Sequence, residues 1–410
     1  MERSRLLLLR AGFHREFAIK TIFRSNIDLG IIERPYINDL AYADYPYIID
    51  DIWNPKKMFD IALEANKKHR FDGIATFADT SIVALGMLSD YLGLDYFSEA
   101  TAKVLINKFE VRKRLSKAGI EDTMFFEVNS IEDLEKAANK LGYPFVLKPT
   151  DRTASKGVVK ITDKNQLEKE YNYTTKISKN KRVIAERYLT GTEYCVEVVV
   201  YKHEPYVVAI TKKSISDGKY CIKLAAVTPA PIEDKLKNKI ESFIKESVRQ
   251  FDIANSILHI EIKADENDKV SLVEINPRPA GGGMIENIYK LKGMNLYDYF
   301  LAIAFKQEID INKLKAEIEK PFNGYALYYS FINPVKSGVI DKVCGINEVS
   351  KELLSGEEKI TLCYRDGDFL PMPETNEDVR GYLYLMAQDS KEIVERSQRI
   401  ANLIDFKLKE

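Results

Sequence analysis

Acidic side chains on two neighbouring strands make the stretch Leu258–Gly283 a candidate metal site. Polar and apolar residues alternate before the polar segment Asp265–Asp268 and alternate again after it. Alternation with a period of two, interrupted by a polar turn, predicts a β-hairpin. With the turn centred on the last two residues of that segment, Glu261 faces Glu274 directly across the two strands.

The facing carboxylates require a positive charge between them, because like charges directly opposite on paired strands repel. Asn276 lies on the same face as Glu274, since side chains repeat every two residues along a strand. Two carboxylates and an amide oxygen suit Mg²⁺, with water and phosphate oxygens completing its shell. Arg278 adds a cation beside the expected phosphate. A solvated polar face is the alternative, but the pairing, the asparagine and the exit Arg-Pro-Ala-Gly-Gly-Gly favour the metal site.

Length and charge exclude several classes of partner. At 410 residues the chain is long enough for two or three domains with sizeable cores. It carries 61 basic and 62 acidic residues, which leaves a formal net charge of -1. This balance argues against nucleic acid or an anionic membrane as the main partner.

The cysteines and the N-terminal sequence indicate a reducing compartment. Cys195, Cys221, Cys344 and Cys363 are widely spaced and form no CxxC pair, so we expect reduced thiols rather than disulfides or a zinc site. The run Leu6–Leu9 is too short for a signal peptide or a membrane span and fits a buried first strand. We therefore expect a soluble, cytoplasmic protein.

Strands and helices alternate along the first hundred residues, which predicts a parallel α/β unit. The expected strands are Leu6–Leu9, Asp28–Ile32 and Phe71–Phe77, and the expected helices are Glu16–Arg24, Pro55–His69 and Asp79–Leu92. Ligands gather at the carboxyl ends of parallel strands. Asp79 follows such an end, so it is a candidate substrate contact, although helix capping explains it equally well.

Lys108 lies within Thr101–Ala118, which the spacing of apolar residues predicts to be one amphipathic helix. A single lysine on a helix is usually solvated, so Lys108 carries no argument alone. Further on, Ser130 is typical of a capping box that opens a helix ending at Gly142.

The next polar loop has the composition of a phosphate-binding turn. A strand closing on Lys148 is followed by Thr150–Lys156, then by Gly157 and a second strand, Val158–Ile161. Such a loop, with Ser155 in it, can present backbone N–H groups to phosphates, and Lys148 supplies a point charge. A hairpin tip without function is the alternative, and the P-loop pattern GxxxxGK[ST] is absent.

A second charged turn offers groups for a nucleoside. The strands Arg182–Leu189 and Glu193–Tyr201 flank it. Backbone groups near Leu189 could bind an adenine edge, and a carboxylate could accept from ribose hydroxyls. In isolation these residues describe only a charged hairpin. The long helix predicted at Glu233–Asp252 then leads into the candidate metal hairpin.

A third unit is expected from Pro321, after the charged segment Lys306–Lys320. Its predicted strands are Gly324–Phe331, Lys359–Tyr364 and Gly381–Met386, and Asp389-Ser390 caps a helix that runs to about Asp405.

Taken in order, these residues resemble the ATP-grasp superfamily over nearly the whole chain. The matching positions are Lys108; Lys148 before Ser155-Lys156-Gly157; Glu186-Arg187-Tyr188-Leu189 with Gly191 and Glu193; Glu261; and Glu274-Ile275-Asn276-Pro277-Arg278.

The resemblance implies a role for each of these residues. Lys108 and Lys148 hold ATP phosphates, and Ser155–Gly157 forms a mobile lid. The adenine and ribose contacts are Glu186, Arg187, Leu189 and Glu193, and the metal ligands for two Mg²⁺, with Mn²⁺ as an alternative, are Glu261, Glu274 and Asn276. Arg278 and Lys148 are expected to act in catalysis, and the expected substrate contacts are Arg278, Gly281, Gly282, Lys223 and Asp79.

Within the superfamily, the sequence Asn-Pro-Arg-Pro-Ala-Gly-Gly-Gly is most similar to the L-amino acid ligases and related carboxylate–amine ligases. The departure lies in Tyr220–Pro229. Dipeptide-forming relatives tend to carry glutamate at the position of Lys223 and histidine at that of Ala226. The identity of the substrates is therefore the open point.

The expected fold is α/β, an ATP-grasp fold with an N-terminal parallel α/β domain at 1–100 and the ATP-grasp domain at 101–320, whose lid subdomain spans about 130–200. A C-terminal α+β unit at 321–410 completes it. The expected activity is ATP-dependent amide formation through an acyl phosphate, from a small-molecule carboxylate and amine. We expect no nucleic-acid or membrane partner, and a homodimer is left open.

Three alternatives stay open at this point. One is another ATP-grasp chemistry, such as a carboxylase module that uses bicarbonate. The second is a non-catalytic nucleotide-binding protein, which would be expected to lack the metal carboxylates. The third is a helix-rich interaction scaffold, which the alternation of strands and helices disfavours.

Overall fold

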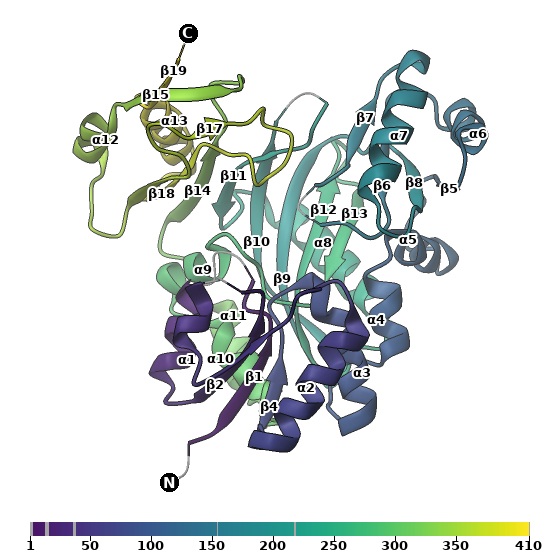
Figure 1. Ribbon diagram of the computed structural model, residues 1–410, viewed down its shortest axis with the longest axis vertical. Helices are drawn as coiled ribbons and strands as arrows, with labels where there is room; N and C mark the ends of the chain where they lie inside the picture. Colours follow the sequence, from purple (N-terminus) through teal and green to yellow (C-terminus); the bar gives the residue numbers. More distant parts are fainter. Residues whose placement is uncertain (1–2, 13–15, 36–37, 154, 217–218, 410) are drawn as a thin grey trace.

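The architecture is taken from a computed structural model, which describes residues 3–12, 16–35, 38–153, 155–216 and 219–409. Position 154, inside the predicted loop Thr150–Lys156, lies outside these ranges. Figure 1 shows the N-terminal unit at one end, with the lid and the C-terminal unit on either side of the central strands at the other. Within the described ranges, no helix combines the length and the apolar character needed to cross a membrane.

The N-terminal unit is the predicted parallel α/β layer. Its strands lie in the order β3-β2-β1-β4, and every pairing between them is parallel. The strands are β1 (Arg5–Leu9), β2 (Asp28–Glu33), β3 (Tyr45–Ile48) and β4 (Gly73–Ala75). The helices are α1 (Glu16–Arg24), α2 (Pro55–His69), α3 (Ile82–Leu92) and the 3₁₀ turns η1 (Asn38–Tyr42) and η2 (Asp79–Ser81).

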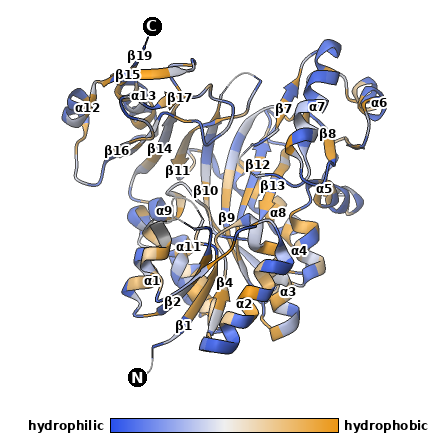
Figure 2. Cartoon of the chain, viewed as in Figure 1, coloured by the Kyte–Doolittle hydropathy of each residue, from blue (hydrophilic) through white to orange (hydrophobic). Residues whose placement is uncertain are grey.

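The apolar run of the first strand is buried as predicted. Leu6 to Leu9 are all 0% exposed, and Figure 2 shows β1 as hydrophobic along its length. The same hydrophobic cluster continues into the central sheet through residues such as Val198 and Ile260. Burial of this shared apolar surface stabilises the N-terminal unit against the central sheet.

The predicted single helix over Thr101–Ala118 is wrong, because the chain forms two helices there. They are α4 (Glu99–Leu105) and α5 (Lys108–Lys117). Asn107 breaks the run, since its side-chain oxygen accepts from the backbone N–H groups of Phe109 and Glu110 and so starts a new helix. Lys108 is therefore the first residue of a helix and does not sit in the middle of one.

The lid is a separate sheet with its own hydrophobic cluster, which runs from Val128 to Ala185. Its strands lie in the order β5-β8-β6-β7 and pair antiparallel. They are β5 (Phe125–Val128), β6 (Phe145–Pro149), β7 (Val159–Ile161) and β8 (Val183–Arg187), and the helical segments are α6 (Ile131–Leu141), η3 (Lys164–Gln166) and α7 (Leu167–Ile177). Ser130 caps α6 as predicted, accepting from the N–H of Asp133.

The central sheet carries the hairpin and extends into the C-terminal unit, in the order β13-β12-β9-β10-β11-β14-β18-β16. The strands are β9 (Thr192–Tyr201), β10 (Glu204–Ile215), β11 (Lys223–Thr228), β12 (Ser256–Ala264), β13 (Val270–Asn276), β14 (Tyr325–Phe331), β16 (Lys359–Leu362) and β18 (Gly381–Ala387). The associated helices are α8 (Asp234–Val248), α9 (Met284–Lys292), α10 (Leu296–Ala304) and α11 (Ile311–Glu319). The sequence analysis identified neither β10 nor β11.

The C-terminal unit is α+β, as predicted. Beyond the shared strands it contains β15 (Gly338–Cys344), β17 (Phe369–Leu370), β19 (Asp405–Leu408), α12 (Ile346–Glu352) and α13 (Ser390–Ala401). The last helix ends earlier than expected, at Ala401, because the chain leaves it to form β19 against β15. The boundaries at 100 and 320 stay predictions, and the charged segment before 320 contains α11.

Candidate active site

The hairpin β12–β13 brings the two predicted metal carboxylates together. Glu261 pairs with Glu274 in the strand register, as the sequence pattern indicated. Each carboxylate has its own lysine partner. Lys108 Nζ lies 2.8 Å from Glu274 Oε1, and Lys213 Nζ lies 2.9 Å from Glu261 Oε2. The positive charge that the repulsion argument required is thus supplied by two lysines from other elements.

These ion pairs shift the pKa values of charged groups at the hairpin. Burial alone would lower the pKa of Lys108, but the Glu274 carboxylate outweighs it and raises that pKa above its ordinary value. Burial opposes ionisation of Glu261 as well, yet Lys213 holds the pKa of Glu261 well below its usual range. Glu261 can therefore present charged oxygens to a cation.

Asn276 completes an oxygen-rich donor set. It lies opposite His259 in the register and follows Glu274 on the same face of β13. Carboxylate and amide oxygens fit Mg²⁺, which favours hard donors. Nearby, His259, Cys195 and Glu261 could form a softer site. The His259 ring, however, already contacts Glu197 Oε1 at 2.7 Å and Glu261 Oε1 at 3.5 Å.

The residues expected to hold ATP line one cavity of about 110 Å³ between the lid and the central sheet. Its wall includes Lys108, Lys148, Ser155, Glu186, Arg187, Leu189, Glu193, Glu261 and Glu274. Gly157 is placed differently. Its carbonyl accepts from the Thr174 hydroxyl at 3.1 Å, and a Cβ on it would lie 2.9 Å from Pro149. In this structure Gly157 serves the packing of the lid.

Arg112, which the sequence analysis missed, orders one side of the nucleotide cavity. It is 3% exposed and binds Glu186 (Nε to Oε1, 3.1 Å) and Glu121 (2.5 Å). Lys148 Nζ contacts the other oxygen of Glu186 at 2.6 Å. Burial would raise the pKa of Glu186, but the Arg112 guanidinium and the Lys148 ammonium lower it to about 2. Glu186 therefore stays ionised and fixes Lys148.

We expect Arg112→Met to lower the free energy of unfolding by about 3 kcal/mol, because removal of one partner leaves Glu186 and Glu121 as buried carboxylates. The stability linked to Glu186 is present above the ordinary pKa of 4.5 and is lost as the pH falls towards 2. Urea unfolding at neutral pH and the midpoint of acid unfolding both test this. Arg114→Met, on the exposed side of the same helix, is the matched control. Equal losses of stability in Arg112→Met and Arg114→Met would contradict this prediction.

A third lysine, Lys213, contacts both the glutamate expected to bind ribose and one of the predicted metal ligands. Its Nζ lies 2.5 Å from Glu193 Oε1 as well as 2.9 Å from Glu261. Burial would lower the pKa of Lys213, but these two carboxylates raise it well above its ordinary value. Lys263, also missed, donates to the Leu189 carbonyl oxygen at 3.1 Å and orders the turn expected to face adenine.

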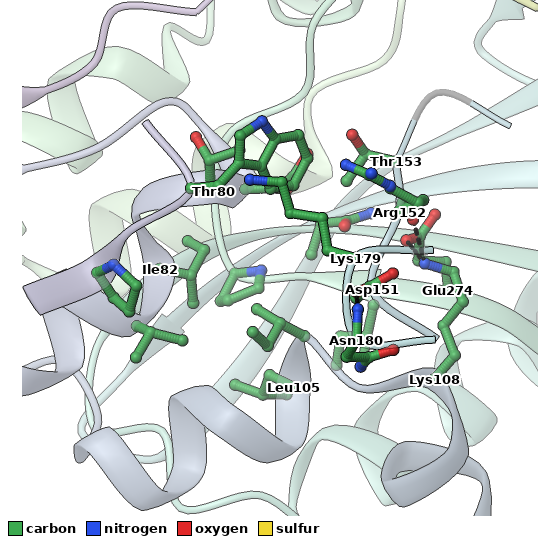
Figure 3. Close-up of a pocket in the computed structure, with 18 residues that line it drawn as sticks. Thr80, Ile82, Leu105, Lys108, Asp151, Arg152, Thr153, Lys179, Asn180 and Glu274 are labelled. Carbon is green, nitrogen blue, oxygen red and sulfur yellow. Dashed lines mark hydrogen bonds and ion pairs between the residues drawn. The ribbon is translucent and has the colours of Figure 1, made fainter. Parts of the chain in front are cut away.

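A second cavity of about 340 Å³ lies between the N-terminal unit and the lid, and its walls include Asp79, Lys108, Glu274 and Asn276. Figure 3 shows Lys108 and Glu274 on one side of it, with Arg152 and Lys179 above them. Apolar side chains such as Leu105 line the opposite wall. An organic substrate placed here would contact both the hairpin and the lid.

Asp79 reaches the active site through Arg278. Arg278 Nη2 donates to Asp79 Oδ2 at 2.8 Å, Nε donates to Oδ1, and Nη1 donates to the Pro279 carbonyl at 2.9 Å. The alternative that Asp79 caps a helix is wrong, because Ala78 and Ser81 occupy the cap positions and neither makes a side-chain cap. Two-point pairing of a guanidinium with a carboxylate fixes the orientation of both groups.

Trp53, also missed, bridges the N-terminal unit and the lid at the edge of the second cavity. The Arg152 guanidinium carbon and the Lys179 Nζ each lie 4.9 Å from its ring centroid. Lys179 Nζ also lies 3.8 Å from Asp51 Oδ1. Cations over an indole ring stabilise such contacts. No sequence spacing links residue 53 to residues 152 and 179, so only the tertiary structure identifies this contact.

The remaining predicted substrate residues meet at the start of α9. Gly282 and Gly283 have positive φ values of 64° and 77° and lead into the helix at Met284. Lys223 comes from β11 to the same place, where a Cβ on Gly282 would lie 3.0 Å from its Nζ. The structure thus brings Lys223 to the glycine loop that follows Arg278.

The fold agrees with the comparisons to known proteins. Residues 141–287 match the family model described as the ATP-grasp domain. An L-arginine-specific L-amino acid ligase from Bacillus subtilis is 25% identical over 374 residues, which cover 90% of this chain and 88% of the relative. An alanine–anticapsin ligase from Bacillus amyloliquefaciens is 27% identical over 362 residues, which cover 80% of this chain and 76% of the relative.

Among solved structures, an L-amino acid ligase from Bacillus licheniformis has the same fold. Its TM-score is 0.84, with 20% sequence identity and 100% of both chains covered. The family match, the full-length relatives and the shared architecture all agree with the resemblance found in the sequence. Residues 141–287 therefore match an ATP-grasp domain, and the whole chain shares its fold with a solved L-amino acid ligase.

Proposed function

We propose that this protein is an ATP-dependent carboxylate–amine ligase that forms an amide bond and releases ADP and phosphate. The observation that carries the proposal is the junction of the two cavities, because Lys108, Arg152, Thr153 and Glu274 line both of them. A phosphoryl group passed from a nucleotide in one cavity to a carboxylate in the other would cross this junction. The relatives named above are ligases, which supports the same activity.

In the first step the substrate carboxylate would attack the γ-phosphorus of ATP, which gives an acyl phosphate and ADP. Lys108 and Lys148 would neutralise charge on the transferred group, because phosphoryl transfer depends mainly on positioning and electrostatic stabilisation. Glu261, Glu274 and Asn276 would hold two Mg²⁺, with Mn²⁺ as an alternative, and the bound ions would supply positive charge that offsets the charge of the phosphates.

In the second step an amine would attack the acyl carbon and displace phosphate. Arg278, held in one orientation by Asp79, would bind the carboxylate or phosphate oxygens of the reacting group. The lid would exclude water, which would otherwise hydrolyse the acyl phosphate. No cysteine or serine nucleophile is needed for either step.

The test is a matrix of carboxylates and amines, supplied singly and in pairs with MgATP, with ADP and phosphate release as the readout. We expect release that requires both a carboxylate and an amine. Release that depends on bicarbonate without an added amine would favour the carboxylase alternative instead. Nucleotide binding without release under any condition would favour a non-catalytic protein, although both metal carboxylates are retained here.

Trp53 provides an optical test of lid movement, because it is the chain's 1 tryptophan. Binding of MgADP should change its emission, since Arg152, one of the two cations over the ring, also lines the nucleotide cavity, and Lys179, the other, lines the adjoining cavity. Lys179→Met should reduce the change, whereas Lys181→Met, two residues further on, should leave it intact. MgADP binding detected by calorimetry with constant emission would show that these contacts do not respond to the nucleotide.

The cytoplasmic location and a homodimeric assembly stay predictions. Size-exclusion chromatography with light scattering would determine the assembly state.

A further inference from the structure

Lys223 differs from Lys108, Lys148 and Lys213 in its lack of an acidic partner among the described residues. Lys108, Lys148 and Lys213 each contact a glutamate carboxylate at 2.9 Å or less. In the described part of the chain, Lys223 Nζ forms no ion pair and lies 4.9 Å from the ring centroid of Tyr328. Burial lowers the pKa of Lys223, and the neighbouring Lys213 ammonium lowers it as well, against opposing contributions from Cys195 and Glu261. An ammonium in this position is stabilised only weakly by the protein itself.

The surroundings of Lys223 offer further groups for a negative charge. Gly282 leaves room for the ammonium under the loop, since its Cβ would lie 3.0 Å from Nζ. Gly283 precedes α9, whose first N–H groups lack partners within the helix and carry partial positive charge. The loop and Lys223 thus converge on one small region between β11 and the start of α9.

A buried amide without partners lies at the same helix end. Asn287 is 0% exposed, and neither its Nδ2 nor its Oδ1 has a hydrogen-bond partner among the described residues. Side chains on a helix lean towards its N-terminus, and Asn287 Oδ1 lies 4.0 Å from the Cβ position of Gly283. A buried polar group without a partner is costly, so it is expected to meet a ligand or ordered water.

We propose that Lys223, the start of α9 and Asn287 form a subsite for a second carboxylate on the substrate that becomes phosphorylated. This inference rests on the proposed ligase activity. One carboxylate of the donor reacts beside Arg278, and the loop Pro279–Gly283 leads from there to the Lys223 ammonium. The donor class is therefore a dicarboxylic acid. A free α-ammonium at this subsite would face the Lys223 ammonium and be repelled.

A hydroxylamine assay tests the donor class independently of the natural amine. Hydroxylamine attacks an acyl phosphate at the acyl carbon, which gives a hydroxamate and phosphate. The donors are succinate, glutarate and adipate, compared with butyrate, L-alanine and L-leucine. We expect the wild-type kcat/KM for a dicarboxylate to exceed that for L-alanine by roughly tenfold to a hundredfold, the range of one hydrogen bond to a charged group.

Two variants identify the role of Lys223. Lys223→Met should reduce this preference for dicarboxylates by a similar roughly tenfold to a hundredfold factor, because only the charged contact is lost. Lys223→Glu should move the preference towards L-alanine and L-leucine. Lys212→Met is the matched control. Lys212 lies next to the active-site residue Lys213 in β10, and adjacent residues of a strand face opposite sides of the sheet. This variant should leave the preference for dicarboxylates unchanged.

The possible failures are distinguishable. No hydroxamate from any of these carboxylates, with MgATP present, would overturn the ligase proposal together with the subsite. Hydroxamate formation with an unchanged donor profile in Lys223→Met would overturn the subsite alone. If Lys223→Glu does not fold, Lys223→Met decides the question, and its folding is checked by thermal unfolding without ligand.

Discussion

Replacement of Glu274 by glutamine is expected to abolish turnover. Glu274 is the carboxylate shared by the two cavities and one of the three proposed metal ligands. Removal of one negative ligand from a paired divalent site should cost several kcal/mol of transition-state stabilisation, which is roughly a thousandfold or more in rate. The measurement is ADP release over a range of Mg²⁺ concentrations. Near-normal turnover at limiting Mg²⁺ would contradict the metal assignment.

The same substitution should leave the fold intact but not strengthen it. Repulsion between Glu261 and Glu274 alone would predict that the substitution stabilises the metal-free hairpin. In the structure this repulsion is already offset by ion pairs. Lys108 Nζ lies 2.8 Å from Glu274 Oε1, and Lys213 pairs with Glu261. We now expect a modest loss of about 1 kcal/mol from the broken Lys108 pair. Glu241→Gln, whose side chain is 28% exposed against 23% for Glu274, is the matched control and should retain full activity.

Arg278→Lys is expected to reduce kcat/KM by roughly a hundredfold to a thousandfold although the positive charge is retained. The guanidinium binds both oxygens of Asp79 and the Pro279 carbonyl at the same time. An ammonium cannot reproduce this planar, two-point geometry. A displaced cation at the reacting centre costs about two to three orders of magnitude, as loss of one preorganised donor does. Steady-state kinetics with the best carboxylate and amine measure the effect.

Asp79→Asn separates the two explanations for such a loss. It removes the charge that positions Arg278 but leaves the guanidinium in place. If Arg278 contacts the reacting group, Arg278→Lys should be clearly more damaging than Asp79→Asn. Equal losses that do not add in the double variant would mean that the pair acts only by holding the N-terminal unit to the central sheet. Retention of most activity by Arg278→Lys would reduce Arg278 to a general electrostatic contributor.

Local sequence predicted the elements that show a strong alternation of polar and apolar residues or a recognisable helix cap. The pairing of Glu261 with Glu274 was predicted from the alternation and the polar turn, but the chain reaches it through a register shift between Glu261 and Ile262, which the alternation did not indicate. The cap at Ser130 was equally local. The break at Asn107 was missed, because the apolar spacing continues across it and hides the cap. The strands β10 and β11 were missed as well, although β10 supplies Lys213 and β11 supplies Lys223.

The sequence by itself thus determined the resemblance to the ATP-grasp superfamily, the parallel N-terminal unit and the order of residues along the proposed nucleotide site, since each depends on local periodicity or on short motifs. Only the tertiary structure decided which charges compensate one another. Arg112 meets Glu186, Arg278 meets Asp79, and Trp53 meets Arg152 and Lys179 across separations in sequence that no period encodes. The physical reason is that a charge taken out of water needs an opposite charge nearby, and the packing of whole elements decides which side chain supplies it.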